Sequence, residues 1–223
     1  MYGGIYSEVQ RVSRAVIFAG GSVSDYDALR CHMQDCQFVV CADSGITHCN
    51  ALGLCADLWV GDFDSSDFEE LSALSAANGT HIIRLNPVKD DTDTEHALDC
   101  VLERGYRDIV LFGGIGTRLD HSIANVFLME KALDKGAVLT IVNDKNILHF
   151  VRNETIILKR NSMKYVSILP LEDVVVSNFG FMYPLNNEKL YRASSRGISN
   201  EIIGNEASIT ISGGAALVIE SVD

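Results

Sequence analysis

The feature that most constrains the fold is a repetition, over the first two-thirds of the chain, of short apolar runs separated by stretches with helical periodicity. The apolar runs stop at Gly or polar residues, which is typical of buried strands that lead into turns. They occupy residues 15–18, 38–42, 58–60, 82–85, 109–112 and 137–142. Strand, helix and strand in repetition predict parallel strands with right-handed crossovers, and therefore an open, three-layer α/β sheet.

Two of the helical stretches are especially clear. Their apolar residues recur on one helical stripe, Ala97, Leu98, Val101 and Leu102 in the first and Leu119, Ile123, Val126 and Phe127 in the second. Thr92 followed by Glu95 has the spacing of a capping box and indicates where the first of these helices begins. Both stripes predict amphipathic helices that pack on a sheet.

The pattern changes near residue 146. The later apolar segments are short, rich in β-branched residues and separated by polar or Gly turns, at residues 147–151, 155–158, 165–169, 174–176, 207–211 and 215–219. Such a series predicts a small all-β sandwich or barrel. We therefore expect an α/β domain over residues 1–145 and an all-β domain over residues 146–223, which pack tightly because no Pro/Gly-rich linker separates them.

Charge and cysteine content limit the partners and the compartment. Lys and Arg number 18 against 30 Asp and Glu, and the net charge of −12 argues against nucleic acids and anionic membranes as partners. No apolar run reaches the roughly 18 residues of a membrane helix, and the N-terminus lacks the features of a secretory signal. The six cysteines form no CxxC pair, and several lie in apolar runs. We expect buried, reduced thiols and a cytoplasmic location.

Carboxylates follow the predicted strands unusually often. They are Asp43 after the second strand, Asp62 and Asp64 after the third, Asp90, Asp91 and Asp93 after the fourth, and Asp120 after the fifth. The carboxyl ends of parallel strands lie along one edge of a sheet, where ligands bind, so we expect these side chains to converge. A cluster of carboxylates needs a cation to offset its repulsion, and hard oxygen ligands suit Mg²⁺.

Each aspartate also has a purely structural interpretation. Asp is favoured at turns and at helix N-caps because its side chain accepts hydrogen bonds from backbone N–H groups. Asp62 and Asp64, two residues apart and flanked by Gly61 and Phe63, fit a cap poorly and the edge of a metal site well. For the group around Asp90 we expect one cap and two remaining carboxylates.

Glycines and one arginine complement the carboxylates. Gly20 and Gly21 follow the first strand, and Gly113, Gly114 and Gly116 follow the fifth, where backbone N–H groups can approach a phosphate closely. Neither stretch matches a dinucleotide-binding or P-loop motif. Arg118 is placed to meet a phosphate, and His121 and Asn125 share a face of the helix that follows. Metal-assisted phosphoryl or pyrophosphoryl transfer is the chemistry that this set favours.

In these segments the sequence resembles the thiamine pyrophosphokinase family. The matching stretches are residues 42–45, 57–65, 89–97, 116–121 with Asn125, 180–185 and 197–201, in the family's order. They span both predicted domains and nearly the whole chain. Thr117 stands where family members often carry Gly, and residues 3–14 match nothing in the family pattern.

The resemblance implies a homodimer that moves pyrophosphate from the co-substrate ATP to the hydroxyl of thiamine and releases AMP. It implies that Asp62, Asp64 and Asp90 hold Mg²⁺ and act in catalysis with Asp93, Arg118 and Asp120. It implies a role in ATP binding for Asp43, Gly113, Gly114, Gly116, His121 and Asn125. It places thiamine at the subunit interface, in contact with Ser199, Asn200 and Tyr183. Asp62 or Asp64 would accept the hydroxyl proton, although a dissociative transition state needs little help from a base.

Three other functions stay open from the residues alone. The acceptor could be a hydroxymethyl pterin on a related nucleotide-binding fold. Water could replace the acceptor, which would make the protein a phosphohydrolase. The pocket could also serve a nucleotide sensor without turnover, although a pure binder has little use for so many repelling carboxylates.

Overall fold

The computed structural model describes residues 13–63, 68–88 and 90–223. The strands are β1 (Arg14–Phe18), β2 (Cys36–Ala42), β3 (Leu58–Gly61), β4 (His81–Arg84), β5 (Asp108–Phe112), β6 (Val138–Val142), β7 (Asn146–Arg152), β8 (Thr155–Lys159), β9 (Tyr165–Pro170), β10 (Val174–Phe179), β11 (Glu188–Leu190), β12 (Glu206–Ser212) and β13 (Ala215–Ser221). The helices are α1 (Tyr26–Arg30), α2 (Ile46–Ala51), α3 (Phe68–Ala77), α4 (Asp93–Glu103) and α5 (Leu119–Asp134), with 3₁₀ turns η1 (Cys31–Met33) and η2 (Asp43–Gly45).

The first six strands form the parallel sheet that the sequence predicts. Their order is β4-β3-β2-β1-β5-β6, and every neighbouring pair in this part of the sheet is parallel. The order reverses direction at β1, between β2 on one side and β5 on the other. Loops that leave the carboxyl ends of adjacent strands on either side of such a switch point diverge and leave a crevice. The fold therefore predicts a ligand site above β1, β2 and β5.

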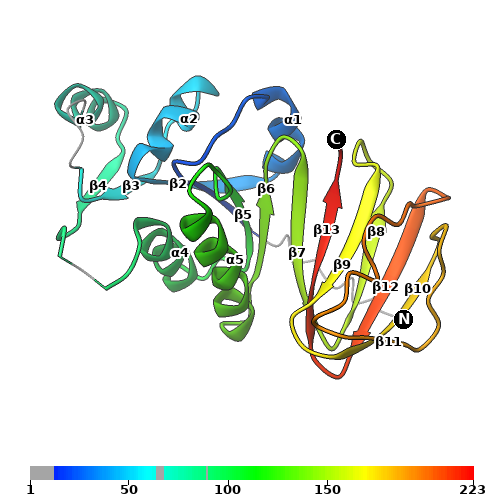
Figure 1. Cartoon of the computed structure of the whole chain (residues 1–223). Coiled ribbons are helices and arrows are strands. Elements are labelled where there is room, and N and C mark those ends of the chain that lie inside the picture. The colour runs from blue at the N-terminus through cyan, green and yellow to red at the C-terminus, as the bar shows by residue number, and fades with distance from the viewer. Residues whose placement is uncertain (1–12, 64–67, 89) are drawn as a thin grey trace, which may run out of the picture.

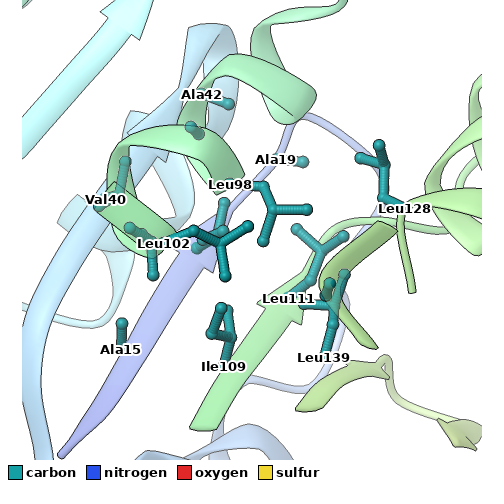
Figure 2. Packing of buried hydrophobic residues seen from close by; sticks show 14 of the residues in the cluster. Ala15, Ala19, Val40, Ala42, Leu98, Leu102, Ile109, Leu111, Leu128 and Leu139 are labelled. Carbon is teal, nitrogen blue, oxygen red and sulfur yellow. The ribbon is translucent and has the colours of Figure 1, made fainter. Parts of the chain in front are cut away.

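Helices cover both faces of this sheet, because neighbouring residues of each strand point to opposite sides. In β1, Ala15 and Ile17 join the apolar cluster beneath α4 and α5, whereas Val16 and Phe18 join the cluster beneath α1 and α2. Figure 2 shows the first cluster, in which side chains from the central strands meet Leu98, Leu102 and Leu128 of the helices. The sheet and its two helical layers make the predicted three-layer α/β architecture.

The sheet does not end with the α/β part. β7 pairs antiparallel with β6, and β13 and β9 continue the same sheet, which has nine strands. A second, four-stranded sheet in the order β11-β10-β12-β8 packs on this extension, as the right-hand part of Figure 1 shows. The core between them is made by residues of both sheets, such as Val166 and Val218 from the first and Ile209 from the second. The C-terminal part is thus the predicted sandwich, but its inner sheet is continuous with the parallel sheet.

The apolar stripe predicted for α5 is wrong, although the helix itself is confirmed. Leu119, Ile123 and Phe127 are 69%, 45% and 62% exposed, and only Val126 of the predicted stripe packs partly on the core. The buried face consists of Ser122, Asn125, Leu128, Met129 and Ala132. Periodicity detects an apolar face of a helix, but it cannot tell a face that meets the core from one that meets another surface.

The cysteines fit the prediction in part. All six are free thiols, and Cys41, Cys49 and Cys100 are buried as expected. Cys31 and Cys55 are exposed, so the expectation of burial was wrong for these two. Among the described residues, no helix has both the length and the apolar character needed to span a membrane.

Candidate active site

A cavity of about 300 Å³ lies at the crevice that the strand order predicts. Its walls come from the loops after β1, β2 and β5 and from the first turns of α4 and α5. The lining residues are Ala19, Gly20, Gly21, Ser22, Ala42, Asp43, Ser44, Thr92, Asp93, Thr94, Gly113, Gly114, Gly116, Thr117, Arg118, His121, Ser122 and Asn125. Of the predicted nucleotide-site residues, all six assigned to ATP binding line it.

Three carboxylates meet at one side of this cavity. One oxygen each of Asp43, Asp62 and Asp93 lies within 4.8 Å of the others, and all three side chains are partly buried. These residues follow β2, β3 and β4 respectively, so the convergence arises from the common edge of parallel strands. Three hard oxygen donors at this separation fit a divalent cation such as Mg²⁺, which commonly retains water and phosphate oxygens as further ligands.

The backbone around Asp43 is held in an uncommon conformation. Asp43 has φ 46° and Phe63, next to Asp62, has φ 55°, both in the left-handed region that non-glycine residues rarely adopt. Trp59 Nε1 donates to the carbonyl oxygen of Asp43 at 2.8 Å, and the Phe63 ring packs edge-on against Trp59 at 4.6 Å between centroids. Trp59 thus contacts both turns that carry the carboxylates, the Asp43 turn by a hydrogen bond and the Asp62 turn by packing against Phe63. Such strain clusters at functional sites.

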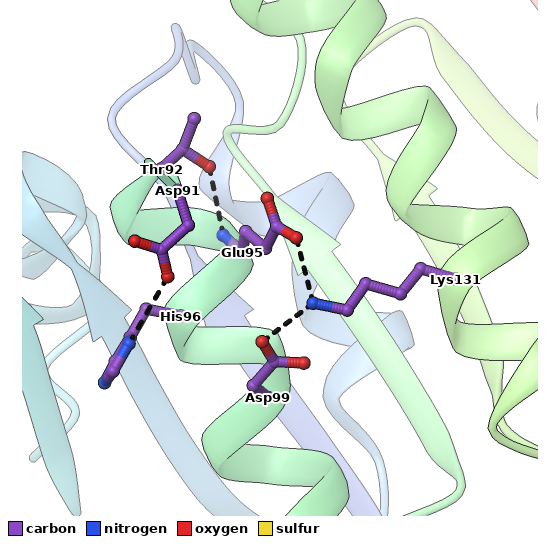
Figure 3. A network of polar contacts seen from close by, with 6 residues as sticks. All are labelled: Asp91, Thr92, Glu95, His96, Asp99 and Lys131. Atoms are coloured by element: carbon purple, nitrogen blue, oxygen red, sulfur yellow. Dashed lines mark hydrogen bonds and ion pairs between the residues drawn. The ribbon is translucent and has the colours of Figure 1, made fainter. Parts of the chain in front are cut away.

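Asp93 is the first residue of α4, and Figure 3 shows the polar contacts of its neighbours at this end of the helix. Thr92 is the N-cap, and its hydroxyl accepts from the backbone N–H of Glu95 at 3.1 Å, which confirms the predicted helix start. The Glu95 carboxylate accepts from Lys131 Nζ of α5 at 2.9 Å, and Asp99 accepts from the same ammonium at 2.7 Å. Two helices are thereby tied together, and Asp93 is held in the first turn of α4.

A further part of the cavity wall is made by two glycine turns in direct contact. Gly21 N–H donates to the carbonyl oxygen of Gly113 at 2.8 Å. A Cβ at Gly21 would lie 2.3 Å from that oxygen, and one at Gly113, which has φ +64°, would lie 2.2 Å from the carbonyl oxygen of Ala19. Only glycine allows the two backbones this approach. The turns therefore present backbone rather than side chains to the cavity, as phosphate binding requires.

Residues at the start of α5 brace the second glycine turn. Asn125 is buried, and its Nδ2 donates to the carbonyl oxygen of Gly114 at 2.8 Å. Ser122 Oγ accepts from Gly116 N–H at 3.1 Å. His121 lines the cavity from the same turn of the helix. The sequence interpretation missed Ser122, although its position one residue after His121 on a predicted amphipathic helix could have suggested it.

Arg118 and Asp120 form an exposed ion pair at the mouth of the cavity. Arg118 Nη2 lies 2.7 Å from Asp120 Oδ2, and Nε lies 3.3 Å from Oδ1. The pKa of Asp120 is lowered to about 2, first because Arg118 donates to its carboxylate and then because the backbone N–H of His121 does. Only Arg118 of the pair lines the cavity, and Asp120 orients its guanidinium.

Substituting Arg118 with Gln is expected to raise the pKa of Asp120 towards the ordinary Asp value of about 4. A lowered carboxyl pKa means that the stabilising interaction is complete above the ordinary value and is lost as the pH falls through the lowered one. Asp120 is therefore expected to remain ionised over the pH range of an activity assay. NMR titration of the Asp120 carboxyl carbon measures both midpoints, and a midpoint near 4 in the unsubstituted protein would contradict the ion pair.

The remaining predicted carboxylates are placed differently. Asp64 lies outside the described residues. Asp90 is exposed and is not among the three carboxylates that approach one another, and Asp91 lies 3.6 Å from His96 Nδ1. The predicted role of Asp90 as a metal ligand stays a prediction, while Asp43, which was expected only nearby, joins the cluster.

The predicted thiamine residues lie on the sandwich, at a second cavity of about 280 Å³. Tyr183 and Asn200 line this cavity, together with Arg196 and Ile198, whereas Ser199 is exposed just outside its lining. Asn200 Nδ2 donates to the carbonyl oxygen of Tyr183 at 2.7 Å, and its Oδ1 accepts from Tyr183 N–H at 3.0 Å. Asn200 thus fixes the backbone of Tyr183 by two hydrogen bonds, and Tyr183 is 63% exposed.

Comparison with known proteins follows the same division of the chain. The family model "Thiamin pyrophosphokinase, catalytic domain" matches residues 29–141, and "Thiamin pyrophosphokinase, vitamin B1 binding domain" matches residues 153–217. Thiamine pyrophosphokinase of Bacillus subtilis (strain 168) is 32% identical over 167 residues, which are 73% of this chain and 77% of that protein.

Solved structures extend the similarity to almost the full length. The crystal structure of thiamine pyrophosphokinase from Bacillus subtilis superimposes with a TM-score of 0.85 at 26% identity, covering 94% of this chain and 99% of that one. That of thiamin pyrophosphokinase from Geobacillus thermodenitrificans has a TM-score of 0.82 at 32% identity, covering 94% and 98%. Nearly the whole length of the chain therefore has a counterpart in these structures.

Proposed function

Because this chain belongs to the thiamin pyrophosphokinase family, we propose that it uses ATP as the pyrophosphate donor and Mg²⁺ as the metal in forming thiamine diphosphate. The observation that carries the proposal is the meeting of Asp43, Asp62 and Asp93 beside a cavity that two glycine turns also line. A polyphosphate chain needs both a cation and backbone N–H donors, and these two walls offer them. The predicted ligand Asp64 follows Asp62 closely in sequence and remains part of the proposal.

In the proposed reaction, the thiamine hydroxyl forms a bond to the β-phosphorus of ATP. The bond from that phosphorus to the oxygen bridging to the α-phosphate breaks, AMP leaves with the electron pair of that bond, and Asp62 or Asp64 would accept the hydroxyl proton. When bound by the carboxylates, Mg²⁺ neutralises charge on the polyphosphate and makes the phosphorus more electrophilic. Positioning and electrostatic stabilisation account for most catalysis of this kind.

The side chains around the cavity have distinct parts in this proposal. Arg118 would contact phosphate oxygens, and Asp120 would orient its guanidinium. Gly113, Gly114 and Gly116 would let backbone N–H groups approach the phosphates, with Asn125 fixing the carbonyl of Gly114. His121 and the hydroxyl of Ser44 line the space left for the rest of the nucleotide.

We further propose that thiamine binds at the cavity of the sandwich, in contact with Tyr183, Ser199 and Asn200. Residues 1–145 would then bind the nucleotide and residues 146–223 the vitamin. Within one chain, β5 and β9 are four strand positions apart, which is about 19 Å at the usual spacing of about 4.8 Å. Reacting atoms must come to about 3–3.5 Å. The separation supports a homodimer in which each cavity meets its counterpart on the other subunit.

The exposed apolar surface supports the same arrangement. Leu119, Ile123 and Phe127 of α5 begin at the mouth of the nucleotide cavity, and Met182 and Ile198, which are 50% and 47% exposed, flank the sandwich cavity. Contiguous exposed apolar patches mark interaction sites.

The free state of all six cysteines supports a cytoplasmic location, where thiols stay reduced.

An AMP-release assay tests the reaction directly. With ATP, Mg²⁺ and thiamine, the protein is expected to release one AMP for each thiamine diphosphate formed, and to release little AMP when thiamine is omitted. Mass spectrometry of the acceptor identifies the product. AMP release with a hydroxymethyl pterin but not with thiamine, or phosphate release without any acceptor, would overturn the proposal in favour of the corresponding alternative.

A further inference from the structure

We propose that His48 is a positioning residue that fixes the glycine turn after β1 relative to the carboxylate side of the active site. This inference rests on the pyrophosphate transfer proposed above, because it concerns how the nucleotide cavity keeps its shape. His48 lies on α2, it is absent from the cavity lining, and no sequence motif singled it out.

The contacts of the His48 ring fix which nitrogen carries the proton. His48 Nε2 lies 2.7 Å from the carbonyl oxygen of Gly21, and Nδ1 lies 2.9 Å from the Tyr26 hydroxyl oxygen. A carbonyl oxygen can only accept, so Nε2 must carry a hydrogen and donate it. In the neutral ring Nδ1 then accepts from the Tyr26 hydroxyl. The Gly21 carbonyl thereby selects the tautomer, and the Tyr26 hydroxyl supports it by donating to Nδ1.

Gly21 is the residue whose displacement would most disturb the phosphate-binding turns. Its N–H donates to Gly113 at 2.8 Å, while its carbonyl accepts from His48, so its two backbone polar groups are both engaged. A Cβ on Gly116 would lie 3.0 Å from Gly21 Cα. The turns after β1 and β5 thus pack on each other through Gly21, and a shift of Gly21 would move both phosphate-binding walls.

The helix that carries His48 also continues the turn that carries Asp43. α2 follows η2 (Asp43–Gly45) directly, and Ile46 and Cys49 of α2 are buried against the sheet. The helix is therefore anchored, and the His48 ring reaches from it to the turn after β1. This imidazole therefore links the turn after β1 to the helix that continues the Asp43 turn, and it adds to the direct packing of Gly20 on Ser44.

Substitutions at His48 and Tyr26 test the inference by separating nucleotide affinity from turnover. His48→Leu removes both hydrogen bonds and is expected to raise the KM for ATP about 10-fold, with kcat changed less than about threefold. His48→Gln can place an amide N–H where Nε2 donates, and is expected to recover most of the affinity. Tyr26→Phe keeps the ring and is expected to raise the KM about threefold.

The readout independent of turnover is calorimetric binding of α,β-methylene ATP, whose α–β linkage cannot be cleaved, in the presence of Mg²⁺. The dissociation constant of the analogue should rise in the variants whose KM for ATP rises, and most in His48→Leu. Cys49→Ala serves as the control, because it leaves a small cavity under the same helix and lowers the melting temperature without touching Gly21. Its affinity for the analogue is expected to match that of the unsubstituted protein.

The outcomes separate this inference from the function on which it rests. If the unsubstituted protein fails to bind the analogue, the proposed function and the inference both fall. If it binds, and His48→Leu lowers the melting temperature as Cys49→Ala does while leaving the affinity unchanged, His48 is merely structural and the inference is overturned. An affinity as low for His48→Gln as for His48→Leu would also overturn it. Should His48→Leu fail to fold, Tyr26→Phe decides by the same measurement.

Discussion

Replacing Asp62 with Asn is expected to lower kcat/KM by a factor of about 10² or more, as the loss of a metal ligand or of transition-state electrostatics does in other enzymes. The substitution keeps the size of the side chain and removes its charge. One of the three carboxylates within 4.8 Å would then no longer hold the cation at full strength. The same reason applies to Asp43 and Asp93. Steady-state kinetics at increasing Mg²⁺ concentrations should show that more metal is required for half-maximal rate.

Asp35→Asn is the matched control for this experiment. Asp35 is exposed just before β2, away from the carboxyl edge of the sheet, and its φ of 61° suits Asn as well as Asp. The Asp35→Asn substitution makes the same change in charge as Asp62→Asn. The activity of this variant is expected to stay within about twofold of that of the unsubstituted protein, since surface substitutions away from a functional site have small effects. Near-normal turnover of Asp62→Asn at saturating Mg²⁺ would remove Asp62 from the site.

Thermal unfolding without substrate provides a second check on the same cluster. Three close carboxylates repel one another, so Asp62→Asn is expected to melt at a slightly higher temperature than the unsubstituted protein when no divalent cation is present. Added Mg²⁺ should stabilise the unsubstituted protein by binding only its folded state, and should stabilise the variant less. An equal shift for both proteins would contradict metal binding at Asp62.

Most of the α/β part could be predicted because its signals are local. The parallel strands β1, β3 and β5 are short apolar runs buried on both faces, as in β1, where residues 15–18 are all buried. The start of α4 was visible because Thr92 caps it. The continuity of the sheet could not be predicted, because β7 pairs with β6 across the expected domain boundary, and its pairing with β13 joins residues far apart in the sequence.

The candidate site could be located by strand ends but not resolved to single side chains. Asp43, Asp90 and Asp93 all follow strands, and it was the family resemblance that favoured Asp90 as a ligand. The structure brings Asp43 and Asp93 together with Asp62 because a left-handed turn redirects Asp43 and the first turn of α4 carries Asp93. The support from Trp59 and His48 was equally hidden, since both act on backbone carbonyls and not through a motif.

Replacing Phe127 with Lys is expected to convert the proposed dimer into a monomer and to lower kcat/KM for thiamine by about 10²-fold, because misplacing reacting groups by about 1 Å can cost that much. Phe127 is 62% exposed on α5, in line with Ile123 and Leu119, so a charge there leaves the fold of the subunit intact. In an apolar interface the same charge would be buried without a partner. Analytical ultracentrifugation measures the assembly. Val138→Lys, at a 58% exposed position at the amino end of β6, is the control and should remain a dimer with full activity.

Mixing two inactive variants decides whether the active site is shared between subunits. Asp62→Asn disables the nucleotide cavity, and Tyr183→Lys is expected to disable the sandwich cavity by placing a cation where the positively charged thiazolium of thiamine would bind. If each site combines one cavity from each subunit, half of the randomly reassociated dimers are mixed, and each mixed dimer has one intact site of two. The mixture should therefore recover about one-quarter of the unsubstituted activity. Recovery should disappear when both variants also carry Phe127→Lys. If each subunit brought its own two cavities together, mixing would restore nothing, and the exposed stripe on α5 would need another explanation.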